Sequence, residues 1–327
     1  MVAPLTVDEP MVPQCYPSKS GSARGINQGH DGHKGTDYFH ELEPSCPFVS
    51  LVSFVVRLPE AMLPRITSRH NPLVTRYRDG ARGRLSNSLL LDGAHLVAEA
   101  LAAGVPIRHV AVSSDAIERA DIRAILDTIA ERGIDIAVAS TAVMEAISPV
   151  RSSSPIVAIG QRPSADLARM YDGTGVLVVI AAGVQDPGNV GAIVRVAEAG
   201  GASGLIAAGS TADPFGWKAL RGSMGSALRL PVVVDPAADH AAADARQRGC
   251  RLVAMVPRGG QPHAESDLRG RVAILVGGEG AGVTQSLVDT ADARVTIPME
   301  PPVESLNAAV AAAVLIYEAR RQRHGQA

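Results

Sequence analysis

Cysteine is scarce in this 327-residue chain, and its placement argues against two kinds of covalent or metal stabilisation. The three cysteines, Cys15, Cys46 and Cys250, are odd in number and widely separated, and no two of them have a CxxC or metal-ligand spacing. Neither a disulfide framework nor a zinc site is indicated. We therefore expect reduced thiols and no metal.

Long apolar runs are also missing from the sequence. No stretch approaches the length of a membrane span, and the N-terminus lacks a charged-then-apolar signal pattern. We therefore expect a cytoplasmic protein without a membrane partner. A composition of 46% hydrophobic and 20% charged residues is typical of a globular protein, and the length favours two domains.

Aromatic residues make up only 3% of the chain, and the net charge is −2. The low aromatic content argues against a base-stacking platform of the kind that single-strand binders use. The average charge gives no reason to expect a nucleic acid partner, but its distribution is uneven. Between Arg57 and Asp92, seven arginines stand against three acidic residues, a local excess of four positive charges. A phosphate-binding segment and a solvated basic helix face explain this excess equally well.

The front half of the chain divides into two segments of different character. Residues 1–60 are rich in Pro, Gly, Ser and His and have no helical or strand period, so we expect a disordered extension, or a true start at Met62. From residue 61 to 160, short apolar runs alternate with amphipathic stretches, which predicts a small α/β domain. Asp92 is expected to cap the helix that follows its first clear strand.

The back half repeats this alternation with longer apolar runs. A polar segment, residues 161–174, is expected to be the linker between two domains. Residues 175–327 then contain continuous apolar strands joined by helices, which predicts a parallel sheet buried on both faces. The last helix is expected from about Ser305 to Arg323. Ligands of such sheets bind in loops beyond the carboxyl ends of the strands, so the segments that follow each apolar run are the candidate binding loops.

The first such loop, QDPGNVGAIVR at residues 185–195, follows the strand VLVVI. Apolar residues at helical spacing predict a helix from Asn189 to Gly200, with Asn189 exposed at its start. Taken alone, Asn189 is explained as a helix cap, and Arg195 as a partner of Glu198.

Two later loops can likewise be explained without a catalytic role when each is taken alone. GGEGAG at residues 277–282 follows the strand VAILV, and glycines there permit close backbone approach to a nucleotide-like cofactor. It lacks the GxGxxG spacing of dinucleotide-binding folds, and no GxxxxGK[S/T] phosphate loop occurs in the chain. IPMEPPVESLN at residues 297–307 precedes the last helix, where Ser305 is explained as its cap.

The three loops in this order, within one α/β domain, are far more specific than any one of them. DPGNVGAIVR, VGGEGAG and IPMEPPVESLN resemble the three motifs of the SpoU/TrmH-type RNA ribose 2'-O-methyltransferases, a family of the knotted SPOUT superfamily. The resemblance covers about Val176 to Arg323. The front domain, with ITSRHNPLV and LLLDGAHLVAEAL, is similar to the small RNA substrate-binding domain, related to a ribosomal-protein fold, that precedes the catalytic domain in many relatives.

The resemblance implies a deep trefoil knot, S-adenosylmethionine as the cofactor, and a homodimer with the site near its interface. It implies cofactor contacts at Gly277, Gly278, Ile297, Met299 and Leu306. It places Asn189, Arg195, Glu279, Ser305 and Asn307 around the transferred methyl group. Relatives usually carry glycine where this chain has Pro301, which fixes φ and removes an N–H, so the loop before Ser305 is expected to have a different shape.

The implied activity is methylation of a ribose 2'-hydroxyl in RNA, most simply in a folded ribosomal RNA. No histidine lies in the three motifs, and a guanidinium stays protonated, so we expect Arg195 to bind the phosphate beside the target and to stabilise developing negative charge. Asn189, Ser305 and Asn307 would orient the ribose. The alternatives are a transfer RNA substrate, a non-catalytic RNA-binding or ribosome-assembly protein, and a nucleotide-dependent oxidoreductase, which the missing fingerprint disfavours.

Overall fold

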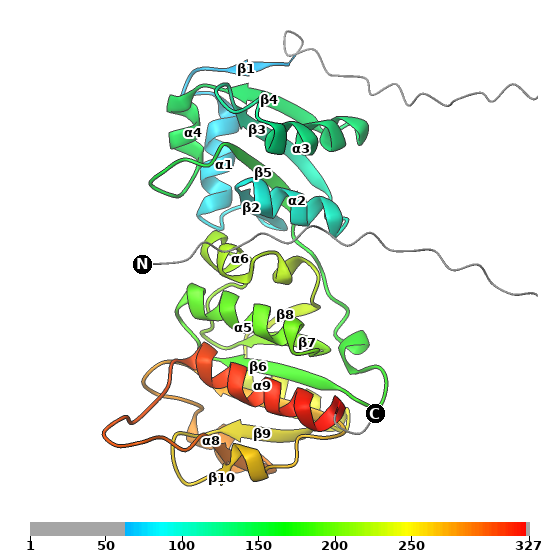
Figure 1. Ribbon diagram of the computed structural model, residues 1–327, viewed down its shortest axis with the longest axis vertical. Helices are drawn as coiled ribbons and strands as arrows, with labels where there is room; N and C mark the ends of the chain where they lie inside the picture. Colours follow the sequence, from blue (N-terminus) through cyan, green and yellow to red (C-terminus); the bar gives the residue numbers. More distant parts are fainter. Residues whose placement is uncertain (1–62, 325–327) are drawn as a thin grey trace, which may run out of the picture. The chain divides into compact units, whose positions relative to one another are not determined.

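The computed structural model describes residues 63–324, and the expectations for residues 1–60 lie outside this range (Figure 1). The first part is a five-stranded mixed sheet in the order β1-β4-β3-β5-β2, in which β5 runs antiparallel to both β2 and β3. Its strands are β1 (Arg65–Ile66), β2 (Ser88–Asp92), β3 (Ile107–Ser113), β4 (Asp135–Ala139) and β5 (Ile156–Gln161). Its helices are α1 (Pro72–Ala81), α2 (Ala94–Ala102), α3 (Ala120–Glu131) and α4 (Thr141–Ile147).

The second part is a seven-stranded sheet in which every pairing is parallel, in the order β10-β12-β9-β11-β6-β7-β8. Its strands are β6 (Leu177–Ala182), β7 (Gly204–Ala208), β8 (Val232–Asp235), β9 (Arg251–Met255), β10 (Gln261–Pro262), β11 (Val272–Gly277) and β12 (Ala293–Thr296). Its α-helices are α5 (Pro187–Ala199), α6 (Trp217–Ser223), α7 (Ala238–Gln247), α8 (Gln285–Thr290) and α9 (Ala308–His324). Short 3-10 turns are η2 (Ala168–Tyr171), η3 (Ser226–Leu228) and η4 (His263–Glu265). The expected parallel sheet is confirmed.

Helices cover both faces of this parallel sheet, as its continuous apolar strands require. Along β6, Leu177 and Val179 pack with α5 and α9, whereas Val178 and Ile180 pack with α7 and α8. Successive side chains of a strand point to opposite faces, so a strand buried on both faces must be apolar at every position. Within the segment expected as linker, Met170 and Tyr171 are buried in the cluster on the α7 side.

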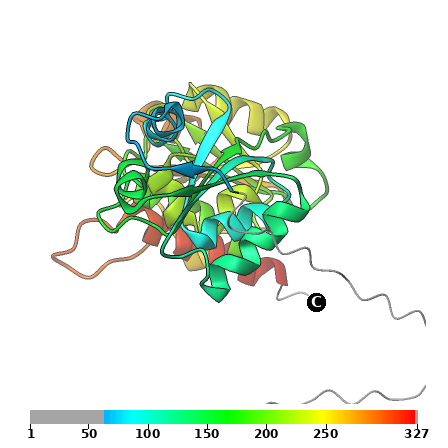
Figure 2. The same ribbon diagram turned by 90° about the horizontal axis from the view of Figure 1, so that it is seen from above.

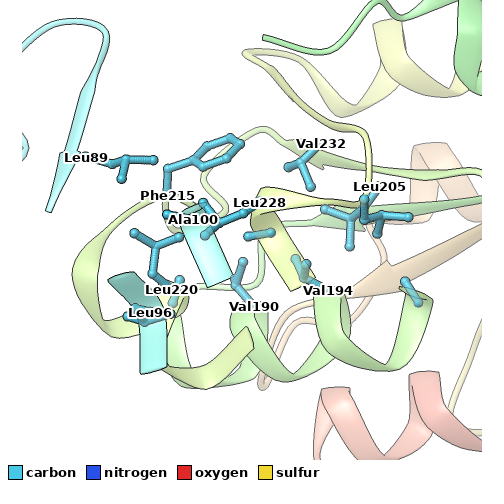
Figure 3. Close-up of a cluster of buried hydrophobic side chains, with 14 of the residues drawn as sticks. Leu89, Leu96, Ala100, Val190, Val194, Leu205, Phe215, Leu220, Leu228 and Val232 are labelled. Atoms are coloured by element: carbon cyan, nitrogen blue, oxygen red, sulfur yellow. The ribbon is translucent and has the colours of Figure 1, made fainter. Parts of the chain in front are cut away.

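The two sheets share one continuous apolar cluster. In Figure 3, Leu89 and Leu96 of the first part lie beside Val190, Leu220 and Leu228 of the second. Removing a side chain of this size from water contributes roughly 1.5–3 kcal/mol. The first part is therefore joined to α5 and α6 by a hydrophobic interface.

Helix ends differ from the predicted ones in three places. Pro187 occupies the first position of α5, and Asp186 caps it by accepting the Asn189 amide N–H at 2.8 Å, so the helix begins before Asn189. The last helix begins at Ala308 and not at Ser305. The expectation that Asp92 caps α2 is wrong, because Asp92 ends β2 and Gly93 takes the cap position at φ 102°.

The segment between β12 and α9 projects from the body of the protein in both views (Figures 1 and 2). Its residues from Pro301 to Asn307 are all exposed. This segment contains the third motif, including Pro301. Within residues 63–324, no helix is long and apolar enough to cross a membrane.

Candidate active site

A cavity of about 400 Å³ lies at the carboxyl edge of the parallel sheet. Three segments line it: the loop after β9 (Met255–Pro257), the loop after β11 (Gly277–Val283), and the chain from Ile297 to Ala311. The strands β12, β9 and β11 are neighbours in the sheet, so their carboxyl ends meet at one place. The volume falls in the range of small-molecule sites, about 300–1,000 Å³.

All five residues expected to contact a cofactor, and three of those expected around the methyl group, line this cavity. They are Gly277, Gly278, Ile297, Met299 and Leu306, together with Glu279, Ser305 and Asn307. The loop after β9 was not singled out in the sequence, although it follows an apolar strand of the same sheet and the same rule would have found it.

The chemistry of the cavity wall suits a cofactor without phosphates. The residues that line it include no Lys, Arg or His, and its one ionisable side chain is the carboxylate of Glu279. Nothing there would neutralise the pyrophosphate of a dinucleotide, whereas a carboxylate complements a positively charged sulfonium or ammonium group. The apolar side chains of Ile297, Met299 and Leu306 provide a surface for an adenine ring. The residues present therefore fit S-adenosylmethionine.

The two glycines after β11 are needed for contacts within the chain itself. A Cβ on Gly277 would lie 2.0 Å from the carbonyl carbon of Gly282, and a Cβ on Gly278 would lie 1.9 Å from the carbonyl oxygen of Gly183. Both distances are far below van der Waals contact, and both partners are backbone atoms. The group that approaches these glycines in the structure is the chain's own backbone, and their expected contact with a cofactor stays a prediction.

A chain of hydrogen bonds connects the three motifs. Asn189 Nδ2 donates to Glu279 Oε1, and Asn307 Nδ2 donates to Asn189 Oδ1 at 2.9 Å. Asn307 Oδ1 accepts the backbone N–H of Ala309 at 2.9 Å, so Asn307 caps α9. These bonds fix which way each amide faces and hold the first turn of α5 beside the cavity. The alternative explanations, in which Asn189 caps α5 and Ser305 caps α9, are therefore wrong. Asp186 caps α5, and Asn307 caps α9.

Ser305 and Arg195 lie apart from this hydrogen-bonded chain. Ser305 lines the cavity and is exposed. Neither Asn189 nor Arg195 lines the cavity itself. Arg195 follows Asn189 by six residues, which places it roughly 240° around the helix and about 9 Å along it. Its exposed side chain forms no hydrogen bond or ion pair within residues 63–324. The alternative that Arg195 pairs with Glu198 is wrong, since Glu198 binds Arg229 at 2.8 Å.

Comparison with known proteins decides which family this geometry belongs to. Residues 176–317 match the SpoU rRNA Methylase family, and residues 90–163 match the RNA 2'-O ribose methyltransferase substrate binding family. The 23S rRNA (guanosine(2553)-2'-O)-methyltransferase RlmP of Bacillus subtilis (strain 168) is 31% identical over 235 residues, which cover 72% of this chain and 89% of RlmP. The chain belongs to the SpoU rRNA methylase family.

Two similar solved structures, one of an rRNA methyltransferase and one of a SpoU methyltransferase, contain bound S-adenosylmethionine (AdoMet). The AdoMet-bound rRNA methyltransferase from Sinorhizobium meliloti superposes with a TM-score of 0.71 at 28% identity, over 79% of this chain and 98% of that one. The SpoU methyltransferase AviRb from Streptomyces viridochromogenes, in complex with AdoMet, gives 0.68 at 28% identity, over 77% and 98%. The SpoU resemblance derived from the three motifs is thereby confirmed.

The arginine-rich stretch before β2 lies outside both family matches, and four of its arginines fall into two groups. Arg69, just before α1, and Arg78, within α1, donate to the carbonyl oxygens of Ala142 and Ala146 of α4. Arg76 and Arg82 are exposed and form no hydrogen bond or ion pair among the described residues. Part of the basic excess is therefore structural, and part remains available to a phosphate.

Proposed function

We propose that the protein transfers a methyl group from S-adenosylmethionine to a ribose 2'-hydroxyl of ribosomal RNA. The observation that carries the proposal is the cavity free of cations, with the Glu279–Asn189–Asn307 chain at its edge. RlmP, named as a 23S rRNA methyltransferase, and the AdoMet-bound relatives support the same reaction.

The cofactor would be held by five residues of the cavity wall, Gly277, Gly278, Ile297, Met299 and Leu306. When bound, it supplies a methyl group already activated by a sulfonium. The chain's own task is to orient the ribose oxygen towards that methyl group and to help the hydroxyl lose its proton. A metal is not needed for this assignment.

Four polar residues would surround the ribose: Asn189, Glu279, Ser305 and Asn307. Asn189 is held on both sides, so its amide presents a fixed pattern of donor and acceptor to the substrate. The carboxylate of Glu279 keeps a second oxygen, Oε2, with which it accepts a proton or a hydroxyl hydrogen bond.

Arg195 would act on the phosphate beside the target. A guanidinium stays protonated in the working pH range, so it contributes charge and a bidentate fork and does not act as a base. Its exposure on α5, without a partner among residues 63–324, supports this role.

We assign substrate recognition to residues 61–160, the connection to residues 161–174, and catalysis to residues 175–327. The first of these would have the ribosomal-protein-like fold named above. Ribosomal RNA is preferred over transfer RNA because RlmP is named for 23S rRNA. The low aromatic content favours reading of RNA shape and phosphates over base stacking. From such a substrate we infer a cytoplasmic location.

We also infer a homodimer. Val310 and Tyr317 are 51% and 50% exposed and lie on the same face of α9. No part of residues 63–324 covers this face. On neighbouring α5, Ala199 and Arg195 are exposed as well. Exposed apolar side chains in a row along one helix are typical of an interface between subunits.

A trefoil knot is the last element of the proposal. After β12 at the side of the sheet, the chain lies against the loops that follow β9 and β11 and then returns to α9, which packs on α5 near the centre. A path of this kind permits the final segment to thread between those loops, against the usual rule.

The test is incubation of the purified protein with methyl-labelled S-adenosylmethionine and total RNA from a strain that lacks the gene. Label recovered as a 2'-O-methyl nucleoside in ribosomal RNA is the expected result. Label in transfer RNA would keep the chemistry and change the substrate. No transfer by protein that binds the cofactor would favour a non-catalytic RNA-binding protein. Stabilisation by NAD in place of S-adenosylmethionine would favour an oxidoreductase.

A further inference from the structure

The loop between α4 and β5, residues 148–155, is held at both ends by one serine. Ser148 Oγ donates to Asp92 Oδ1 at 2.8 Å and accepts the backbone N–H of Ser154 at 3.2 Å. The loop is thus closed on itself and fastened to the carboxyl end of β2. Its middle, including Arg151, is exposed.

Helix α6 of the catalytic part reaches the same carboxylate. Arg221 donates from a terminal nitrogen to Asp92 Oδ2 at 2.9 Å. The Asp92 side chain is 0% exposed, whereas that of Arg221 is 46% exposed. A buried carboxylate is tolerated only when it is paired, so Asp92 holds loop 148–155 and α6 in one arrangement.

Two cations border this arrangement without partners of their own. Lys218 lies one turn before Arg221, so the two share a face of α6. Lys218 and Arg151 are both exposed, and neither forms a hydrogen bond or ion pair within the described part of the chain. The Lys218 ammonium lies over the ring of Trp217, 5.5 Å from its centre.

Helix α6 also presses directly on the start of α5. A Cβ on Gly191 would lie 2.3 Å from the carbonyl oxygen of Ala219 and 2.9 Å from the amide nitrogen of Ser223. Backbone contact this close leaves no room for sliding. The start of α5, which carries Asn189 two residues before Gly191, is therefore held against α6, which carries Lys218.

We propose that the RNA backbone next to the target nucleotide docks on a junction surface formed by residues 148–155 and 217–223, with Arg151 and Lys218 contacting phosphates. The inference rests on the proposed methyltransferase function. Arg151 lies in the segment that matches the substrate binding family, and Lys218 in the segment that matches the methylase family. The Asp92–Arg221 pair holds loop 148–155 and α6 together. An RNA strand that contacts both would therefore have a fixed position relative to the active site.

The experiment compares the full-length protein with the double variant Arg151→Gln/Lys218→Gln, using 23S ribosomal RNA transcribed in vitro as the probe. Binding is measured at several salt concentrations. The matched control is Arg108→Gln, another exposed arginine without a partner among residues 63–324. The strand register pairs Ile107 with Gly160 and Val112 with Ile156, so Arg108 lies at the end of β3 and β5 away from loop 148–155.

Each phosphate contact contributes about 0.7–0.9 to the slope of log affinity against log salt. The double variant is expected to lose about 1.4–1.8 of that slope and, near about 0.1 M salt, to bind about 25- to 60-fold more weakly. Its S-adenosylmethionine affinity and melting temperature should match those of the wild type, because both side chains are exposed and outside the cavity.

An unchanged slope in the double variant would overturn the proposed docking surface, as would a loss of about 0.7–0.9 in Arg108→Gln, the full value for one phosphate contact. Failure of the proposed function is a separate outcome, since it would appear in the wild type as absence of methyl transfer to any RNA. A wild type that methylates RNA beside a double variant with normal affinity would refute this surface alone.

Discussion

Asn189 is the residue whose replacement tests the polar chain most sharply. Its amide donates to Glu279 and accepts from Asn307, so Asn189→Asp keeps the shape and removes the donor. The change also places a second carboxylate beside Glu279. A hydrogen bond to a charged acceptor contributes about 1.5–3 kcal/mol, and 1.4 kcal/mol corresponds to about tenfold in rate. We expect kcat to fall by about 10- to 100-fold.

The assay is methyl transfer to ribosomal RNA at saturating cofactor and RNA, with cofactor affinity measured by calorimetry. Because Asn189 does not line the cavity, its replacement should leave cofactor affinity nearly unchanged. Gln185→Ala is the control, since Gln185 precedes the same helix, is exposed and has no hydrogen-bond partner for its side chain within residues 63–324. A folded Asn189→Asp protein with kcat within about twofold of the wild type would refute the reasoning. It would show that the hydrogen bonds among Glu279, Asn189 and Asn307 are not needed to orient the ribose for the reaction.

Four further outcomes follow from the structure. Gly191→Ala should lower the free energy of unfolding by about 2 kcal/mol or more, measured by urea denaturation, because its Cβ would meet the Ala219 carbonyl oxygen at 2.3 Å; an unchanged midpoint would contradict the close packing of α5 on α6. Burial lowers the pKa of His109 from its ordinary 6.5, and its Nδ1 lies 2.7 Å from the Tyr77 hydroxyl, so stability should be full above about pH 6.5 and fall as the pH drops towards the lowered pKa; His109→Gln should lose less stability between about pH 7.5 and about pH 5.5, and a parallel loss would argue against this group. Arg195→Lys should reduce turnover about tenfold or more with cofactor affinity unchanged, whereas near-normal turnover would exclude a role for the planar fork. Val310→Asp should shift the protein to monomers in sedimentation, and a persistent dimer would place the interface elsewhere.

The parallel sheet was predictable because its strands are buried on both faces and are therefore apolar at nearly every position, as in the run VLVVI. The position of the cavity followed from the same pattern, since loops after neighbouring parallel strands meet at one edge. Three of the four loops that form the site, those with Asn189, Glu279 and Ser305, were identified in this way.

What could not be predicted depended on contacts between residues distant in sequence. Asp92 before Gly93 has the local pattern of a helix cap, but its actual partners are Ser148 and Arg221, 56 and 129 residues later. Asp186 was passed over in favour of Asn189 as the start of α5, although Pro187 is a known mark of the first helical position. The reason for glycine at 278 is the carbonyl oxygen of Gly183, which no local pattern reveals.

The measurement that tests the central claim most directly is a comparison of ribose methylation across the ribosomal RNA of three strains. One strain has the gene, one lacks it, and one carries the Asn189→Asp variant at equal protein level. The account predicts one 2'-O-methylated nucleotide in ribosomal RNA that is present in the first strain, lost in the second, and strongly reduced in the third. Identical ribose methylation in all three strains, or loss of a methyl group from a base in place of a ribose, would contradict it.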